Sequence, residues 1–153
     1  MAEMAGRLAM PRLDFPYRGL EESGRNYPKI PMVLFNPEDS AKQTRILGLV
    51  DTGADITMLD SALMLPLGME TDQPADAPLG GINTEAPIKG WERTLIIGLG
   101  TDTSPELFHP NGLDPVPVIF VEKPNPQLIG RTNFLDRCQL TFNSWVGRLT
   151  LEF

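Results

Sequence analysis

Residues 46–60, ILGLVDTGADITMLD, place an Asp-Thr-Gly turn between two apolar segments. Residues 46–50 form an uninterrupted apolar run, which predicts a buried strand, and a second apolar segment begins at Ile56. An Asp directly after a buried strand either lies in a surface turn with its carboxylate in solvent, or has its carboxylate held inward. The fold must therefore either expose Asp51 or give it a specific environment.

The rest of the chain predicts an all-β fold with one or two short helices. Pro 15 and Gly 14 favour many turns over long helices. Asp60 is a candidate N-cap for one short helix that ends by Pro66 and Gly68. Strand patterns cover residues 29–36, 44–50, 56–60, 92–99 and 116–123, a strand and helical turn follow within 124–138, and a closing hairpin turns at 143–147.

Three further segments are interpreted from local chemistry. Residues 71–100 predict a long hairpin with its tip at 80–87, where Gly80 and Gly81 supply turn residues. Residues 101–115 predict a proline-interrupted loop with His109 on the surface. Trp145 is expected to pack in the core, although Trp145 and Leu149 could instead cover the sheet edge or widen an interface.

The chain of 153 residues is long enough for one domain with a core of its own. Residues 1–28 are predicted to be an N-terminal arm or a propeptide, because Pro11, Pro16 and Pro28 interrupt regular structure. Residues 29–153 form the predicted domain.

Composition excludes several functional classes. A net charge of −7 disfavours nucleic-acid and anionic-membrane partners. With one Cys138 and one His109, no thiolate–imidazole zinc site is expected, and no metal or cofactor is predicted. The start of the chain lacks the apolar segment of a signal peptide, so a cytoplasmic location is expected.

A carboxylate held inward at Asp51 suggests acid–base chemistry. Two neighbouring carboxyl groups do not both ionise, so they share one proton, and together they can activate water and protonate a carbonyl oxygen. Gly53 lets the backbone approach the carboxylate and donate to it. The chain contains only one Asp-Thr-Gly, so a pair requires a homodimer with Asp51 on its two-fold axis.

Three blocks of sequence resemble the retropepsins, the homodimeric aspartic proteases of retroviruses and their cellular and bacterial relatives. LVDTGADITML resembles the active-site loop. LGGINTEAPIKGWERTLIIGLG resembles the flap hairpin and the strand behind it. VPVIFVEKPNPQLIGRTNFLDRCQLTFN resembles the later strand, the Gly-Arg turn and the helix near the end. The resemblance implies an acid-protease β-barrel with a flap hairpin.

The resemblance also assigns roles. Asp51 would be the catalytic carboxylate of an aspartic endopeptidase that hydrolyses peptide or protein substrates. Thr52 would interlock with its copy across the dimer, and Gly53 would contact the substrate backbone. Asp55 would hold substrate main chain and pair with Arg131. The flap tip would comprise Gly80, Gly81 and Ile82, and Ala54 and Gly130 would support the site with Arg131.

The chain departs from the viral pattern in two places. NTEAP stands where a second glycine pair is expected in the flap, and SWVGRLTLEF continues beyond the viral C-terminus. These departures leave an alternative open, in which the same fold serves as a non-enzymatic dimerisation or peptide-binding module.

Overall fold

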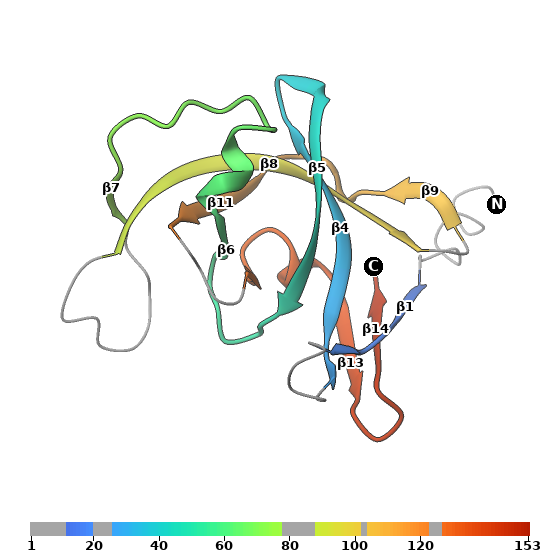
Figure 1. Cartoon of the computed structure of the whole chain (residues 1–153). Helices are drawn as coiled ribbons and strands as arrows, with labels where there is room; N and C mark the ends of the chain where they lie inside the picture. The colour runs from blue at the N-terminus through green and yellow to red at the C-terminus, as the bar shows by residue number, and fades with distance from the viewer. Residues whose placement is uncertain (1–11, 20–25, 78–87, 102–103, 123–126) are drawn as a thin grey trace.

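The computed structural model describes residues 12–19, 26–77, 88–101, 104–122 and 127–153, and these are mostly β-strands (Figure 1). The helical segments among them are two short 3-10 helices, η1 (Ser61–Met64) and η2 (Leu135–Arg137). The strands are β1 (Arg12–Pro16), β2 (Arg18–Gly19), β3 (Asn26–Tyr27), β4 (Lys29–Asn36), β5 (Asp39–Val50), β6 (Thr57–Asp60), β7 (Ala75–Ala77), β8 (Ile88–Thr101), β9 (Ser104–Phe108), β10 (Pro110–Leu113), β11 (Val116–Val121), β12 (Leu128–Ile129), β13 (Gln139–Asn143) and β14 (Arg148–Glu152).

Strand β8 closes the larger sheet into a barrel. Its first part pairs with β11 and its second part pairs with β4. From β4 the pairing continues through β5, β12 and β6, and β6 pairs in turn with β11. The pairing thus returns to β8, which removes the free edges that an open sheet would expose. The predicted all-β barrel is confirmed.

Strand β11 lies between two apolar layers, which explains its nearly continuous apolar sequence, VPVIFV. On one face Phe120 belongs to the main core, where it is fully buried beside Leu59 of β6. On the other face Ile119 and Val121 form a smaller cluster with Ile56 and Met58. This second cluster includes the first residues after the Asp51 turn, so it packs next to the candidate site.

A smaller sheet, ordered β1-β14-β13, joins the two ends of the described chain. Phe15 of β1 lies opposite Leu149 of β14, and both side chains are buried in the main core. The prediction that prolines exclude regular structure from residues 1–28 is therefore wrong for Arg12–Pro16. Pro16 ends the strand, on the outer edge of the sheet, where a missing N–H is tolerated.

Residues 101–115 also differ from the predicted loop. Within the described part, β9 and β10 are strands, and β9 pairs with the end of β8. His109, expected at the surface, is half-buried between them, with its ring centroid 5.8 Å from that of Phe35. The ring contact with an apolar neighbour explains why this imidazole is withdrawn from solvent.

The closing hairpin and the short helix form where the sequence predicts them, with one exception in side-chain placement. The Asp60 side chain caps η1 by accepting from the Ala62 N–H, and Gly68 ends the segment at φ 66°. Trp145 does not pack in the core, because it lies in the turn between β13 and β14 and is 96% exposed. No helix in the described residues is long and apolar enough to cross a membrane.

Candidate active site

The Asp51 turn begins where β5 ends. The backbone N–H of Asp51 donates to the Ile129 carbonyl at 3.0 Å, which fixes the start of the turn against β12. The Ala54 N–H then donates to the Asp51 carbonyl at 3.2 Å and closes the turn. Gly53 donates its N–H to Oδ1 of Asp51 at 2.9 Å. The predicted close approach of the glycine backbone to the carboxylate is therefore present.

The Asp51 side chain is half-buried, whereas Thr52 and Gly53 are exposed. Among the described residues, Gly53 is the one hydrogen-bond donor to the carboxylate. A Cβ on Gly53 would lie 3.2 Å from Oδ1 of Asp51, so a larger residue would crowd this contact. The turn thus presents a partly desolvated carboxylate with an oxygen left for another molecule.

The two-residue strand β12 holds the Asp51 turn in place, because the carbonyl of its Ile129 accepts from the Asp51 N–H. In the sheet, β12 lies between β5 and β6, parallel to β5 and antiparallel to β6. The chain runs from β5 to β6 through the Asp51 turn, so this turn connects the two strands on either side of β12. Gly130 follows β12 and packs directly on backbone, because a Cβ there would lie 2.5 Å from the Ile56 carbonyl carbon. Its N–H donates at 3.1 Å to Oγ1 of Thr57, which is fully buried.

Asp55 and Arg131 connect the turn to the segment after β12. The Arg131 guanidinium donates to Oδ1 of Asp55, and both side chains are half exposed. Two main-chain hydrogen bonds join the same two segments. The Arg131 N–H donates to the Ala54 carbonyl at 2.9 Å, and the Thr132 N–H donates to the Asp55 carbonyl at 2.8 Å. The pairing between Asp55 and Arg131 is as the resemblance implies.

The structure therefore brings together most of the candidate residues on one turn and its support: Asp51, Thr52, Gly53, Ala54, Asp55, Gly130 and Arg131. The predicted flap residues Gly80, Gly81 and Ile82 lie outside the described residues. The segments that flank them do pair, since β7 runs antiparallel to the start of β8. Sequence reasoning missed Thr57, whose only signal is a hydroxyl at the start of β6, just before the apolar residues Met58 and Leu59.

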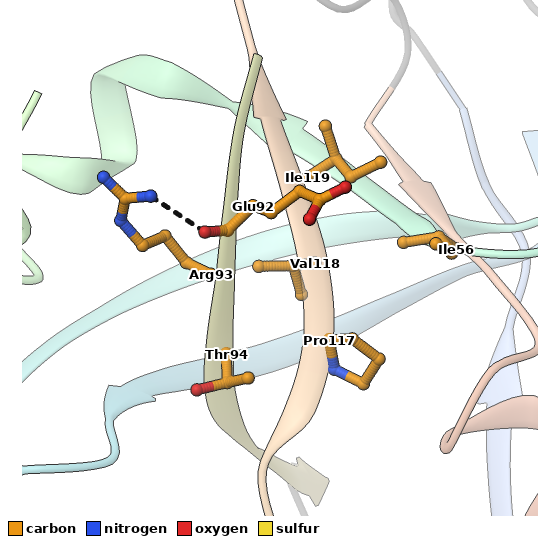
Figure 2. A pocket seen from close by; sticks show the side chains of 7 residues that line it. All are labelled: Ile56, Glu92, Arg93, Thr94, Pro117, Val118 and Ile119. Carbon is orange, nitrogen blue, oxygen red and sulfur yellow. Dashed lines mark hydrogen bonds between the residues drawn. The ribbon is translucent and has the colours of Figure 1, made fainter. Parts of the chain in front are cut away.

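A pocket of about 470 Å³ opens beside this region, on the surface of the paired strands β8 and β11 (Figure 2). Ile56, which follows Asp55 in the turn, lines it together with Ile119 and Pro117. In Figure 2 the Arg93 side chain turns to the far side of β8, where it donates to the Glu92 carbonyl at 2.8 Å. The wall nearest the candidate site is therefore mainly apolar, with the Glu92 carboxylate close to Ile119.

The site offers carboxylate chemistry without a metal cluster. Within the described ranges, no group of three or more His, Cys, Asp or Glu side chains is placed to hold a metal ion. The Asp55 carboxylate is paired with Arg131, whereas the turn presents the Asp51 carboxylate, which is held by an amide donor and fixed to a closed barrel. Such a group can act as a general acid or base, and a two-role acid pair needs a second carboxylate.

Comparison with known proteins identifies the fold. No protein-family model and no curated protein sequence matches the chain. Its structure is similar to the crystal structure of a retropepsin-like aspartic protease from Rickettsia conorii, with a TM-score of 0.59 over 95% of this chain and 94% of that chain. At 14% sequence identity this likeness establishes the retropepsin-like fold alone.

Proposed function

We propose that the protein is an aspartic endopeptidase that acts as a homodimer. The observation that carries this proposal is the Asp51 carboxylate, which is held by the Gly53 amide at 2.9 Å on a turn fixed to β12. The retropepsin-like fold supports the same function, because the structural neighbour from Rickettsia conorii is a retropepsin-like aspartic protease.

In the proposed mechanism, Asp51 and the same residue of the second copy share one proton. The ionised carboxylate removes a proton from water, and the protonated one donates to the carbonyl oxygen of the scissile peptide bond. The carboxyl group that took the proton from water then donates a proton to the nitrogen of the tetrahedral intermediate, and the other carboxylate takes a proton from one of its hydroxyl groups. The C–N bond breaks, and the pair again holds one shared proton. The Gly53 amide keeps the carboxyl group in one orientation during these proton transfers.

The proposed substrate is an extended peptide that binds beside the turn through main-chain hydrogen bonds, as an added strand. Asp55 supports this role, because its carboxylate is half exposed while Arg131 holds it in place. The apolar pocket next to Ile56 favours an apolar side chain in the substrate. In the same proposal, Gly80, Gly81 and Ile82 close over the bound peptide.

Asp51→Asn tests the proposal. Asn retains an oxygen that can accept from Gly53, so the fold is expected to remain, whereas a proton-sharing pair cannot form. We expect cleavage of an unstructured protein at mildly acidic pH to fall by roughly 10³-fold or more relative to wild type. Equal residual cleavage by the two proteins would refute the proposal and favour the non-enzymatic module.

A further inference from the structure

The pocket on the surface of β8 and β11 contains a carboxylate that the proposed mechanism does not use, that of Glu92. The Glu92 residue is exposed, and within the described part of the chain no hydrogen bond or ion pair engages its carboxylate. In Figure 2 this side chain extends toward Ile119, whereas the Arg93 side chain turns to the other side of β8. The pocket therefore carries a negative charge that has no partner among the described side chains.

Strand register determines which side chains share the pocket with Glu92. In the antiparallel pair of β8 and β11, Glu92 lies opposite Ile119. Two positions along the pair, Thr94 lies opposite Pro117. Alternate residues of a strand point to opposite faces, so these four side chains lie on one face of the sheet, and Val118 lies on the other face in the main core. Directly opposed side chains have Cβ atoms about 4.5–5.5 Å apart, so Ile119 provides apolar surface beside the carboxylate.

Two arginines in this part of the structure are paired with other carboxylates. Arg93 follows Glu92 in β8, and its guanidinium lies 2.8 Å from Oδ1 of Asp72. Arg131 holds Asp55, the residue before Ile56. Neither guanidinium forms an ion pair with Glu92, so a cation that neutralises the Glu92 carboxylate has to come from the bound molecule.

A long basic side chain fits both parts of this pocket. Ile56, Pro117 and Ile119 form the apolar wall, and the Glu92 carboxylate lies beside it. Lysine and arginine carry several methylene groups before their charge, so the stem can cover apolar surface while the charged end stays near solvent. A purely apolar side chain covers the same wall but leaves the carboxylate unpaired, and an acidic side chain is repelled by it.

We infer that Glu92 makes the protein select peptides with a lysine or arginine residue close to the cleaved bond. This inference rests on the proposed function, because it assigns the pocket next to Ile56 to the substrate. The basic side chain lays its stem along Ile119 and places its cation at the Glu92 carboxylate. Glu92 is then a specificity-determining residue and takes no part in proton transfer.

Cleavage of matched peptides tests the inference. Wild type first digests an unstructured protein, and mass spectrometry identifies the position relative to the cleaved bond at which lysine and arginine are enriched. Two peptides are then compared that carry lysine or norleucine at this position, since norleucine has the same apolar stem without the ammonium group. We expect kcat/KM to be about fivefold higher for the lysine peptide. High salt is expected to reduce this ratio, because it screens an exposed charge pair.

Glu92→Gln removes the charge and keeps the size of the side chain, so the ratio of kcat/KM between the two peptides is expected to fall to about one. Glu92→Lys is expected to invert the ratio. Glu38→Gln is the matched control, because it removes the same charge from an exposed glutamate that lines a different pocket. Its ratio is expected to match wild type, although the net charge of −7 changes equally in both glutamine variants.

The outcomes separate the specificity from the chemistry. Digestion without enrichment of basic residues, or a lysine preference that Glu92→Gln retains, overturns the inferred role of Glu92. If wild type cleaves and Asp51→Asn does not, the proposed function stands in either case. If wild type and Asp51→Asn cleave equally, the proposed function is wrong, and fluorescence anisotropy then compares the binding of lysine-containing and norleucine-containing peptides. Tighter binding of the lysine peptides that Glu92→Gln abolishes would support the basic pocket, and equal dissociation constants would overturn it.

Discussion

The guanidinium of Arg131 donates a hydrogen bond to Oδ1 of Asp55, although 76 positions separate the two residues in the sequence. The same two segments are already joined by main-chain bonds from Arg131 to Ala54 and from Thr132 to Asp55. The side-chain pair is half exposed, so solvent screens its charges. Its main contribution is therefore to orient the Asp55 carboxylate beside the Asp51 turn rather than to stabilise the barrel.

Arg131→Lys separates these two contributions. The main-chain bonds remain, so the free energy of unfolding is expected to fall by less than about 1 kcal/mol. Lysine offers a flexible point charge in place of a planar fork, so Asp55 loses its fixed orientation, and kcat/KM on a peptide substrate is expected to fall about tenfold or more. Urea denaturation and steady-state kinetics measure the two effects.

Arg12→Lys is the control for this substitution. Arg12 forms a comparable exposed ion pair with Asp14, 3.7 Å apart, in β1. Its exchange for lysine is expected to leave both stability and kcat/KM near wild type. An equal loss of activity in both variants would show that Arg131 has no specific orienting role.

Thr57 is expected to determine how β12 supports the turn. Thr57→Val keeps the shape of the side chain but removes the acceptor for the buried Gly130 N–H, which costs about 1–3 kcal/mol of stability. Thr57→Ser keeps the hydroxyl and removes only a methyl group. We therefore expect peptidase activity to fall in the Val variant and to be retained in the Ser variant, as measured after both are confirmed folded. Equal activity in the two would contradict a role for this hydrogen bond.

Much of the barrel and the Asp51 turn could be predicted because their signals are local. The alternation and apolar runs around residues 46–60 determine the strands, and the Asp-Thr-Gly turn follows from neighbouring residues. The pairing of β1 with β14 could not be predicted in this way, because Asp14 and Thr150 meet across 136 positions through contacts that neither segment specifies alone.

The prediction that Trp145 packs in the core is wrong for a different physical reason. The free energy of removing an indole from water is similar whether the covering surface belongs to the same chain or to another. Hydrophobicity alone therefore does not determine whether this chain covers Trp145, which is 96% exposed in the turn between β13 and β14. His109 shows the converse error, since a polar residue in a proline-rich segment is half-buried against Phe35.

Phe15→Ala tests whether β1 is part of the domain or a removable arm. Phe15 is buried against Leu149, so truncation to Ala is expected to lower the free energy of unfolding by about 3–5 kcal/mol. A chain that begins at residue 29 is expected to be destabilised at least as much, because it lacks β1 altogether. Urea denaturation of both proteins gives these values. A stable, active chain that begins at residue 29 would show that the arm is dispensable.

Cys138 gives the fold a specific sensitivity to alkaline pH. Burial, and secondly the negative charge of Asp136, raise the pKa of its thiol from 9.0 to about 11. Between these values the unfolded chain releases the thiol proton while the folded chain retains it, so the free energy of unfolding decreases as pH rises from 9 to 11. Below pH 9 both states are protonated and this contribution is constant. Urea denaturation from pH 8 to pH 11 is expected to show a steeper decline for wild type than for Cys138→Ser, which carries no thiol; parallel curves would place Cys138 in a solvent-like environment.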